Sequence, residues 1–100
     1  MAATTVVRIL TRSGHEARWE RTCAGAEAAA REWQPEVILL DRHLPDGDGV
    51  ALAKRLRRRH PRPRLIVMSG DPLDAAEAQA VDAHLLKPAT VQAVLAAVTG

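Results

Sequence analysis

The stretch PEVILLDRHLPDGDG, residues 35–49, decides the fold of this chain. Its apolar residues 37–40 run without alternation into Asp41, which predicts a strand buried on both faces of a parallel sheet. The proline and glycines of residues 44–49 predict a tight loop immediately after that strand. Asp41 is therefore expected at the carboxyl end of a strand, which is the edge where open α/β sheets carry their chemistry.

Helical and extended patterns alternate along the rest of the chain. Apolar residues at helical spacing predict helices at residues 2–12, 26–33, 50–59, 71–80 and 91–98. The segments between them predict further strands at residues 15–21, 65–69 and 82–86. Asp48 and Asp71 are the expected caps of the third and fourth helices. The alternation predicts an α/β fold with parallel strands, right-handed crossovers and helices on both faces of the sheet.

The composition limits the chain to a single small domain, residues 1–100. It contains 47% hydrophobic residues but no Phe or Tyr, so the core is expected to be aliphatic and rich in alanine, with Trp33 as an anchor. One cysteine, Cys23, cannot form an internal disulfide. No apolar run approaches the roughly 20 residues that span a bilayer, and no signal-peptide pattern is present. We expect a soluble cytoplasmic domain without a membrane partner.

Basic residues concentrate at residues 54–64, and the net charge is +2. Cations in a last helical turn complement the helix dipole, which accounts for most of this cluster as a solvated helix end. No aromatic residues interleave with the cluster, and no recognised DNA- or RNA-binding pattern occurs. The sequence therefore disfavours nucleic acid as a partner.

Two later motifs, each at the end of a predicted strand, complete a pattern with Asp41. LIVMSG at residues 65–70 ends in Ser69, and AHLLKP at residues 83–88 ends in Lys87 and Pro88. In order and spacing, the three motifs resemble the receiver domain of two-component response regulators, and the resemblance covers essentially the whole chain. It implies a flavodoxin-like (CheY-like) open parallel sheet, here with about four strands and five helices.

The resemblance also implies roles for individual residues. Asp41 would be the phosphoacceptor, Lys87 the counter-ion of the phosphate and Ser69 the switch hydroxyl. A carboxylate can form an acyl phosphate, and cations around it neutralise the developing charge. The aromatic switch position of the family falls on His84, which we interpret as a neutral structural residue rather than a pH switch. Lys87-Pro88 is a candidate for the cis peptide that the family usually has at this position.

The first strand of the family, with its pair of acidic residues, has no counterpart in this sequence. In the family those acids hold Mg²⁺ together with the phosphoacceptor and a backbone carbonyl, here Asp41 and the carbonyl of His43. No acidic residue precedes Glu16, and Asp41 alone makes a poor magnesium site. We expect a receiver truncated at its N-terminus, whose missing strand would be central. Three solutions stay open: pairing of the second strand with the third, residues 4–10 serving as a strand, or self-association through the open sheet.

Three hypotheses about function follow from these residues. The first is a phosphorelay receiver that accepts a phosphoryl group on Asp41 from a sensor histidine kinase or a phosphotransfer protein. The second is a degenerate pseudo-receiver that acts as a protein-interaction module without phosphorylation. The third, a phosphatase-like enzyme with an Asp nucleophile, needs further acids that the sequence lacks. We therefore expect a signalling domain and not a turnover enzyme.

Overall fold

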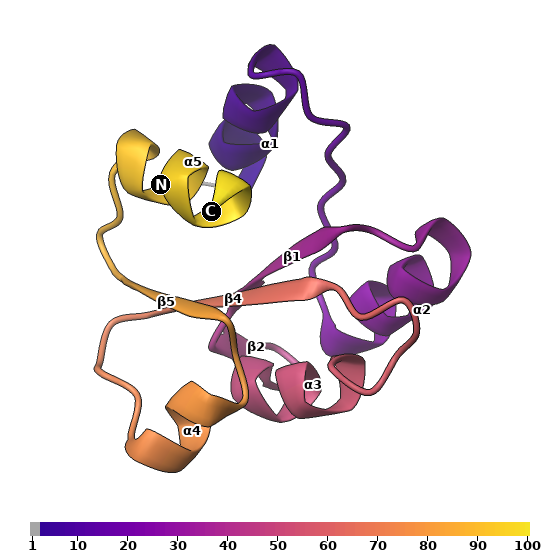
Figure 1. The fold of residues 1–100 in the computed structure, drawn as a ribbon, viewed down its shortest axis with the longest axis vertical. Coiled ribbons are helices and arrows are strands. Elements are labelled where there is room, and N and C mark those ends of the chain that lie inside the picture. Colours follow the sequence, from indigo (N-terminus) through magenta and orange to yellow (C-terminus); the bar gives the residue numbers. More distant parts are fainter. Residues whose placement is uncertain (1–2) are drawn as a thin grey trace.

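The computed structural model describes residues 3–100, and Figure 1 shows the path of the chain. Its helices are α1 (Ala3–Arg12), α2 (Cys23–Trp33), α3 (Gly49–Leu56), α4 (Ala75–Gln79) and α5 (Val91–Thr99). Its strands are β1 (Val37–Asp41), β2 (His43–Leu44), β3 (Gly47–Asp48), β4 (Arg64–Ser69) and β5 (Ala83–Leu86). The five helices and the α/β alternation confirm the fold class.

The main sheet has three parallel strands in the order β1-β4-β5. The pairs Asp41 with Met68 and Ser69 with Leu86 lie at the carboxyl ends of these strands. A parallel pair needs a long crossover, and α3 and α4 supply the two crossovers here. Strands β2 and β3 form a separate small antiparallel pair within the loop after Asp41, which the sequence did not predict.

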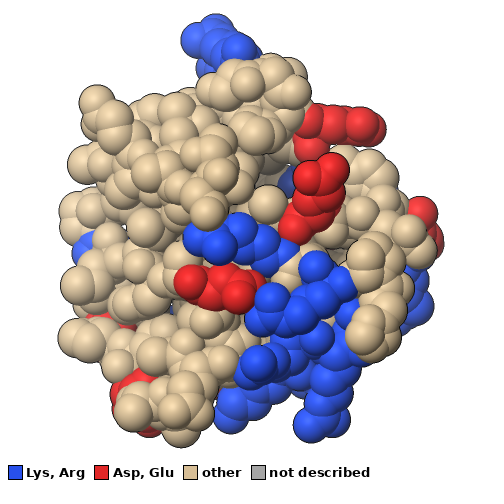
Figure 2. Space-filling model, viewed as in Figure 1, with Lys and Arg blue, Asp and Glu red and all other residues tan. Residues whose placement is uncertain are grey.

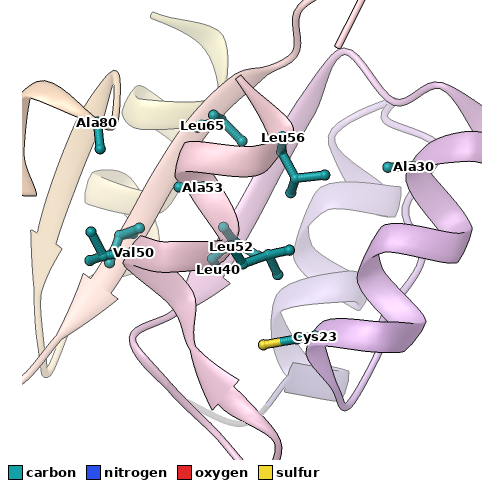
Figure 3. Close-up of a cluster of buried hydrophobic side chains, with 10 residues drawn as sticks. Cys23, Ala30, Leu40, Val50, Leu52, Ala53, Leu56, Leu65 and Ala80 are labelled. Carbon is teal, nitrogen blue, oxygen red and sulfur yellow. The ribbon is translucent and has the colours of Figure 1, made fainter. Parts of the chain in front are cut away.

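Helices cover both faces of the sheet: α1 and α5 lie on one face, and α2 and α3 on the other (Figure 1). The main core lies between the sheet and α2 and α3 (Figure 3). It is aliphatic and rich in alanine, as predicted, and its members are Cys23, Ala30, Leu40, Val50, Leu52, Ala53, Leu56, Leu65, Val67 and Ala80. Because this core packs against β1 and β4 directly, it fixes where the carboxyl ends of these strands lie.

Side-chain caps decide where the helices begin. Asp48 caps α3 as predicted, since its carboxylate accepts a hydrogen bond of 3.0 Å from the amide of Val50. The predicted cap Asp71 is wrong. The fourth helix starts later because Asp74 and Glu77 form a capping box, in which each side chain accepts from the backbone of the other.

The predicted strand at residues 15–21 is also wrong, so the main sheet has three strands and not four. Residues 15–20 are irregular, and residues 4–10 belong to helix α1, which excludes them as a replacement strand. A strand exists only where a neighbour supplies ladder hydrogen bonds. Among residues 3–100, β1 has only β4 as such a neighbour, and a groove separates its other edge from residues 15–20.

Trp33 does not anchor the core. It is half-buried at the end of α2, and the guanidinium of Arg18 lies 5.5 Å from the centroid of its ring. This distance is within the range of a cation–π contact. The ring lines the groove beside β1 instead.

Lys and Arg side chains gather over α3 and the loop that follows it (Figure 2). Several are already engaged: Arg55 lies 2.7 Å from Glu27, and Arg62 lies 3.1 Å from Asp82. Arg57 donates to the carbonyl of Gln79 at 2.8 Å. These contacts join α3 and its loop to neighbouring elements, which fits the interpretation of the cluster as a solvated helix end.

Asp46 connects the loop after β1 to the start of α2. One of its carboxylate oxygens accepts from the amide of Cys23 at 2.7 Å and the other from the amide of Ala24 at 3.1 Å. These backbone hydrogen bonds lower the pKa of Asp46 below its usual value. A carboxylate at a helix N-terminus also interacts favourably with the helix dipole.

We expect Asp46→Ala to lower the Tm at neutral pH. Because the folded-state pKa is the lower one, the stabilisation is complete above the unfolded-state pKa and is lost as the pH falls through the folded-state pKa. The difference in Tm between the wild type and Asp46→Ala should therefore be full above about pH 5 and shrink in more acidic buffer. Thermal melts at pH values above and below about 5 measure this difference. Glu32→Ala, on the exposed side of α2, is the control. A difference that is independent of pH would contradict the role of the carboxylate charge.

Candidate functional site

Asp41 is the last residue of β1, where the buried apolar run ends and the chain turns outward. Its side chain is 35% exposed, so an incoming group can reach it. One carboxylate oxygen accepts a hydrogen bond of 3.0 Å from the amide of His43, which holds the start of the following loop. Asp41 therefore lies at the exposed carboxyl edge of the sheet, as the sequence predicted.

Lys87 brings a positive charge to the other oxygen of this carboxylate. It follows β5 directly, and its Nζ lies 2.5 Å from Oδ2 of Asp41. The peptide bond between Lys87 and Pro88 is cis, as the resemblance suggested. Both side chains are substantially exposed, so the pair contributes at most about 1 kcal/mol to stability. Its main consequence is to place a cation beside the carboxylate.

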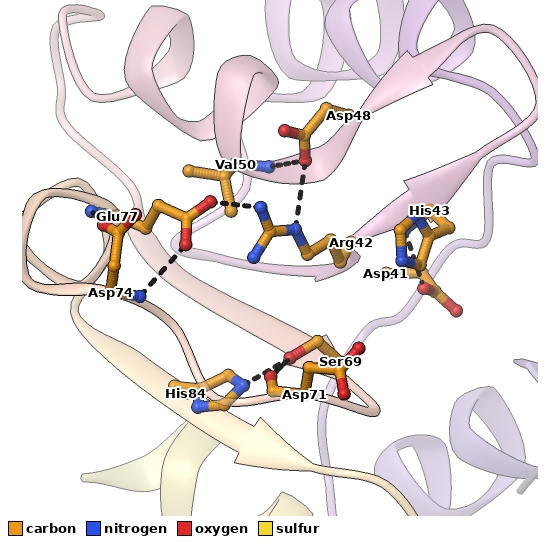
Figure 4. A network of polar contacts seen from close by, with 10 residues as sticks. All are labelled: Asp41, Arg42, His43, Asp48, Val50, Ser69, Asp71, Asp74, Glu77 and His84. Carbon is orange, nitrogen blue, oxygen red and sulfur yellow. Dashed lines mark hydrogen bonds and ion pairs between the residues drawn. The ribbon is translucent and has the colours of Figure 1, made fainter.

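Ser69 ends β4, the strand between the other two, and its side chain is buried. The hydroxyl donates to the carbonyl of Asp71, and its oxygen lies 2.6 Å from Nε2 of His84 (Figure 4). A hydroxyl has one proton, so the hydrogen of this second contact must come from Nε2 of His84. The two predicted switch residues are thus bonded to each other, and the hydroxyl is engaged away from Asp41.

Arg42 and Glu77 form a link that the sequence did not reveal. The guanidinium of Arg42 donates to the carboxylate of Glu77 on α4, and it also lies 3.7 Å from Asp48 (Figure 4). The hydrogen bond from Arg42 lowers the pKa of Glu77, which keeps that carboxylate charged. The residue directly after Asp41 is therefore joined to α4. No local pattern could have predicted this pair, because its members are 35 positions apart.

The residues around Asp41 do not fit a magnesium ion. Mg²⁺ needs one or two carboxylates with free oxygens in an octahedral arrangement. Here Asp41 is the carboxylate at the site, Lys87 occupies one of its oxygens and the amide of His43 the other. Within residues 3–100, no group of three or more His, Cys, Asp and Glu side chains is arranged to hold a metal. The predicted ligand Asp41 thus has both of its oxygens engaged and does not complete a site with the carbonyl of His43.

The family follows from a comparison of the whole sequence with known families. The model of the response regulator receiver domain matches residues 1–99. This chain belongs to that family. Receiver domains are signalling domains that interact with histidine kinases or phosphotransfer proteins, and they generally bind Mg²⁺ at an acidic pocket. In the part of this receiver domain that is described, no helix combines the length and apolar character needed to cross a membrane.

Solved structures and a curated relative agree with this assignment. The chemotaxis response regulator CheY4 of Vibrio cholerae superposes with a TM-score of 0.86 at 20% identity, covering 96% of this chain and 85% of its own. A response regulator of Burkholderia pseudomallei gives a TM-score of 0.82 at 32% identity, covering 96% of this chain and 59% of its own. That structure was solved with a phosphorylated aspartic acid, calcium ion and citrate.

The photosynthetic apparatus regulatory protein RegA of Rhodobacter capsulatus is 27% identical over 67 residues, which are 67% of this chain and 36% of that protein. The chain therefore spans about a third of this curated relative. The similarity concerns the receiver domain and not the regulator as a whole.

Proposed function

We propose that this receiver domain accepts a phosphoryl group on Asp41 from the phosphohistidine of a sensor kinase or a phosphotransfer protein. The contact between Asp41 and Lys87 carries this proposal, because it combines an accessible carboxylate with a cation at its oxygen. The phosphorylated aspartic acid of the Burkholderia pseudomallei relative supports it. A sensor kinase of the cytoplasm would be the partner, and the domain itself would turn over no substrate.

The chemistry proposed for Asp41 is an in-line displacement at phosphorus. A carboxylate oxygen forms the new bond to phosphorus, the bond from phosphorus to the imidazole nitrogen of the kinase breaks, and the imidazole leaves with that electron pair. Lys87 keeps its ammonium group beside the oxygens on which negative charge increases, so it stabilises the transition state. No step is assigned to Mg²⁺, because the described residues do not complete a site for it.

Ser69 would change partners after this step. To donate to a phosphoryl oxygen on Asp41, its hydroxyl must give up the carbonyl of Asp71, and the contact with His84 then loses its present geometry. His84 lies on β5 and so would transmit the change to that edge of the sheet. A modification that favours one of two hydrogen-bonded arrangements shifts their populations, which is the general form of a signalling switch.

A second candidate function has one observation in its favour. The single carboxylate at the site and its pairing with Lys87 leave no group that would hold a metal, and phosphoryl transfer depends on neutralised charge. A pseudo-receiver that binds a protein partner without phosphorylation would need neither a metal ion nor neutralised charge at Asp41. The two functions differ in whether Asp41 gains a phosphoryl group.

We expect incubation with acetyl phosphate to add one phosphoryl group to the protein, measured by intact mass. Asp41→Asn should abolish the addition, because an amide oxygen is a much weaker nucleophile than a carboxylate. Asp71→Asn is the matched control: the side chain of Asp71 is exposed, and only its backbone carbonyl contacts Ser69. Parallel incubations with Mg²⁺ and with a chelator show whether the modification requires the ion.

An unchanged mass in a sample shown to be folded would contradict the phosphoacceptor role. The pseudo-receiver that binds a protein partner would then be the remaining candidate function. Modification that persists in Asp41→Asn would place the phosphoryl group on another residue and would also contradict the proposal.

A further inference from the structure

Helix α4 differs from the other four helices in how it is held. It has five residues, and none of them is buried. Each of the other helices has at least one buried residue. A helix of five residues is not stable by itself in water, since most helical stability in proteins comes from the packing of an apolar face. Contacts other than core packing must therefore keep α4 folded and in place.

The segment that carries α4, residues 71–80, is attached to the sheet at both ends. At its start, the hydroxyl of Ser69 on β4 donates to the carbonyl of Asp71. Just beyond its end, Asp82 bonds twice to Leu65 on β4: its amide donates to the carbonyl at 2.8 Å, and its carboxylate accepts from the amide at 2.8 Å. We call residues 71–80 the α4 segment. It spans two fixed points, and α4 lies between them.

Two arginines from elsewhere in the described chain bond to α4 itself. Arg57, at the end of α3, donates to the carbonyl of Gln79 at 2.8 Å, but this contact is exposed to solvent. Arg42 donates to the carboxylate of Glu77, and both of these side chains are about one-fifth exposed, at 21% and 19%. A charge-assisted hydrogen bond that is largely shielded from water is the stronger of the two kinds. The pair of Arg42 and Glu77 is therefore the main side-chain contact of α4.

The two members of this pair are supported very differently. The backbone of Arg42 is fixed on both sides, since its amide donates to the carbonyl of Met68 at 2.8 Å and its carbonyl accepts from the amide of Gly49 at 2.7 Å. Glu77 lies on the helix without core packing, and its second carboxylate oxygen caps that helix by accepting from the amide of Asp74 at 3.0 Å (Figure 4). Arg42 thus reaches from a rigid backbone to the residue that caps α4.

We propose that the contact between Arg42 and Glu77 is a latch on the α4 segment. With the latch closed, α4 is folded and docked. When it opens, the α4 segment unfolds locally between its two fixed points, while the sheet and the rest of the main core stay intact. Local opening of this kind is expected where few apolar contacts hold a segment.

Opening of the latch would uncover part of the main core. Ala80 belongs to that core, and Leu73 packs against it from the other end of the α4 segment. The arm of the latch is the residue directly after Asp41, so the end of β1 controls whether this apolar surface is covered. The latch is a property of the unmodified chain and does not depend on phosphoryl transfer to Asp41.

Amide hydrogen exchange in the wild type tests whether the α4 segment opens by itself. The amides of Ala78 and Ala80 donate to carbonyls within this segment at 2.9 and 3.0 Å, and they should exchange more slowly than in an unfolded peptide. The amides of Ile66 and Val67 on β4, both at 0% exposed residues, report the opening of the whole domain. Exchange at Ala78 and Ala80 should be faster than at β4 and independent of low urea, because a local opening exposes little surface.

Two matched variants test the role of the latch. Arg42→Gln should speed exchange at Ala78 and Ala80 about tenfold, the effect of one charge-assisted hydrogen bond. Arg55→Gln removes another contact between an arginine and a glutamate, that of Arg55 with Glu27 on α2. This contact persists while the α4 segment is open, so Arg55→Gln should change exchange at Ala78 and Ala80 less than about twofold.

A double-mutant cycle assigns the effect to the pair. Glu77→Gln keeps the cap of α4, because glutamine can also accept from the amide of Asp74, but it removes the charge that Arg42 binds. Glu77→Gln should speed exchange in α4 as Arg42→Gln does. The double variant should exchange no more than about twofold faster than either single variant, since both remove the same contact.

Four results would overturn the proposal. Exchange at Ala78 and Ala80 that rises with urea in parallel with β4 would mean that α4 opens only with the whole domain. Exchange in the wild type at the rate of an unfolded peptide would mean that α4 is not docked at all. Rates in Arg42→Gln within about twofold of the wild type would mean that the contact does not hold the helix. Additive effects of the two substitutions would mean that they act separately.

Discussion

Gly49→Ala should destabilise the domain by about 3 kcal/mol and displace the backbone at Asp41. A Cβ atom at position 49 would lie 2.2 Å from the carbonyl oxygen of Asp41 and 3.1 Å from the Cα of Arg42. Both atoms belong to the backbone, so neither can rotate out of the way. The amide of Gly49 also donates to the carbonyl of Arg42 at 2.7 Å, which holds the start of α3 against the end of β1. To accept a methyl group, α3 or the segment that carries Asp41 must move.

Urea denaturation and backbone chemical shifts measure this effect, and Gly70→Ala provides the control. Gly70 follows Ser69 directly, but a Cβ there would meet no atom within 4 Å. An alanine with no strain reduces the freedom of the unfolded chain, so Gly70→Ala should stabilise by about 0.4–1 kcal/mol or leave stability unchanged. We expect large shift changes at residues 41 and 42 for Gly49→Ala alone. Equal stabilities of the two variants would mean that the start of α3 can relax at no cost.

Leu52→Ala should lower the free energy of unfolding by about 2–5 kcal/mol. Leu52 lies on the inner side of α3 with 0% of its side chain exposed, and it packs within the main core against β1 and β4 (Figure 3). Removing its isobutyl group loses the transfer free energy and leaves a cavity, because the surrounding side chains relax only partially. The total free energy of unfolding of a native protein is about 5–15 kcal/mol, so this loss is a large share of the stability.

The matched control is Leu86→Ala, the same chemical change at a leucine that is 52% exposed. It should alter stability by no more than about 0.5 kcal/mol. Thermal melts distinguish the two variants, since a change of 1 kcal/mol in the free energy of unfolding shifts the Tm by roughly 4–8 °C for a domain of about 100 residues. A Leu52→Ala variant as stable as Leu86→Ala would show that the core under α3 can collapse around the missing group.

Local patterns were sufficient for much of the candidate site. The apolar run before Asp41, the strand before Ser69 and the strand before Lys87 each end at a polar residue, and parallel strands must bring such ends to one edge. The structure confirms the contact between Asp41 and Lys87 and places Ser69 on the strand between them. The roles of these residues in phosphoryl transfer stay predictions, which the mass measurement tests.

Contacts between distant residues were beyond local patterns. Arg42 and Glu77 pair through their side chains, Asp46 accepts from the first amides of a helix that starts 23 positions earlier, and His84 bonds to the Ser69 hydroxyl. Each contact depends on where two elements come to lie, and any exposed arginine, aspartate or histidine would look the same in the sequence. The cap of α4 was misassigned to Asp71 because Asp74 is an equally good candidate locally.

The sequence by itself determined the order of the helices and of the three parallel strands from residue 23 onward, the aliphatic core and the alignment of Asp41, Ser69 and Lys87, because hydrophobic periodicity and turn residues act over a few positions. Only the tertiary structure decided what residues 15–21 do. Their pattern suits a strand, but a strand needs hydrogen bonds from a neighbour, and none of the described residues supplies one. The segment therefore lies apart from β1, and a groove separates the two.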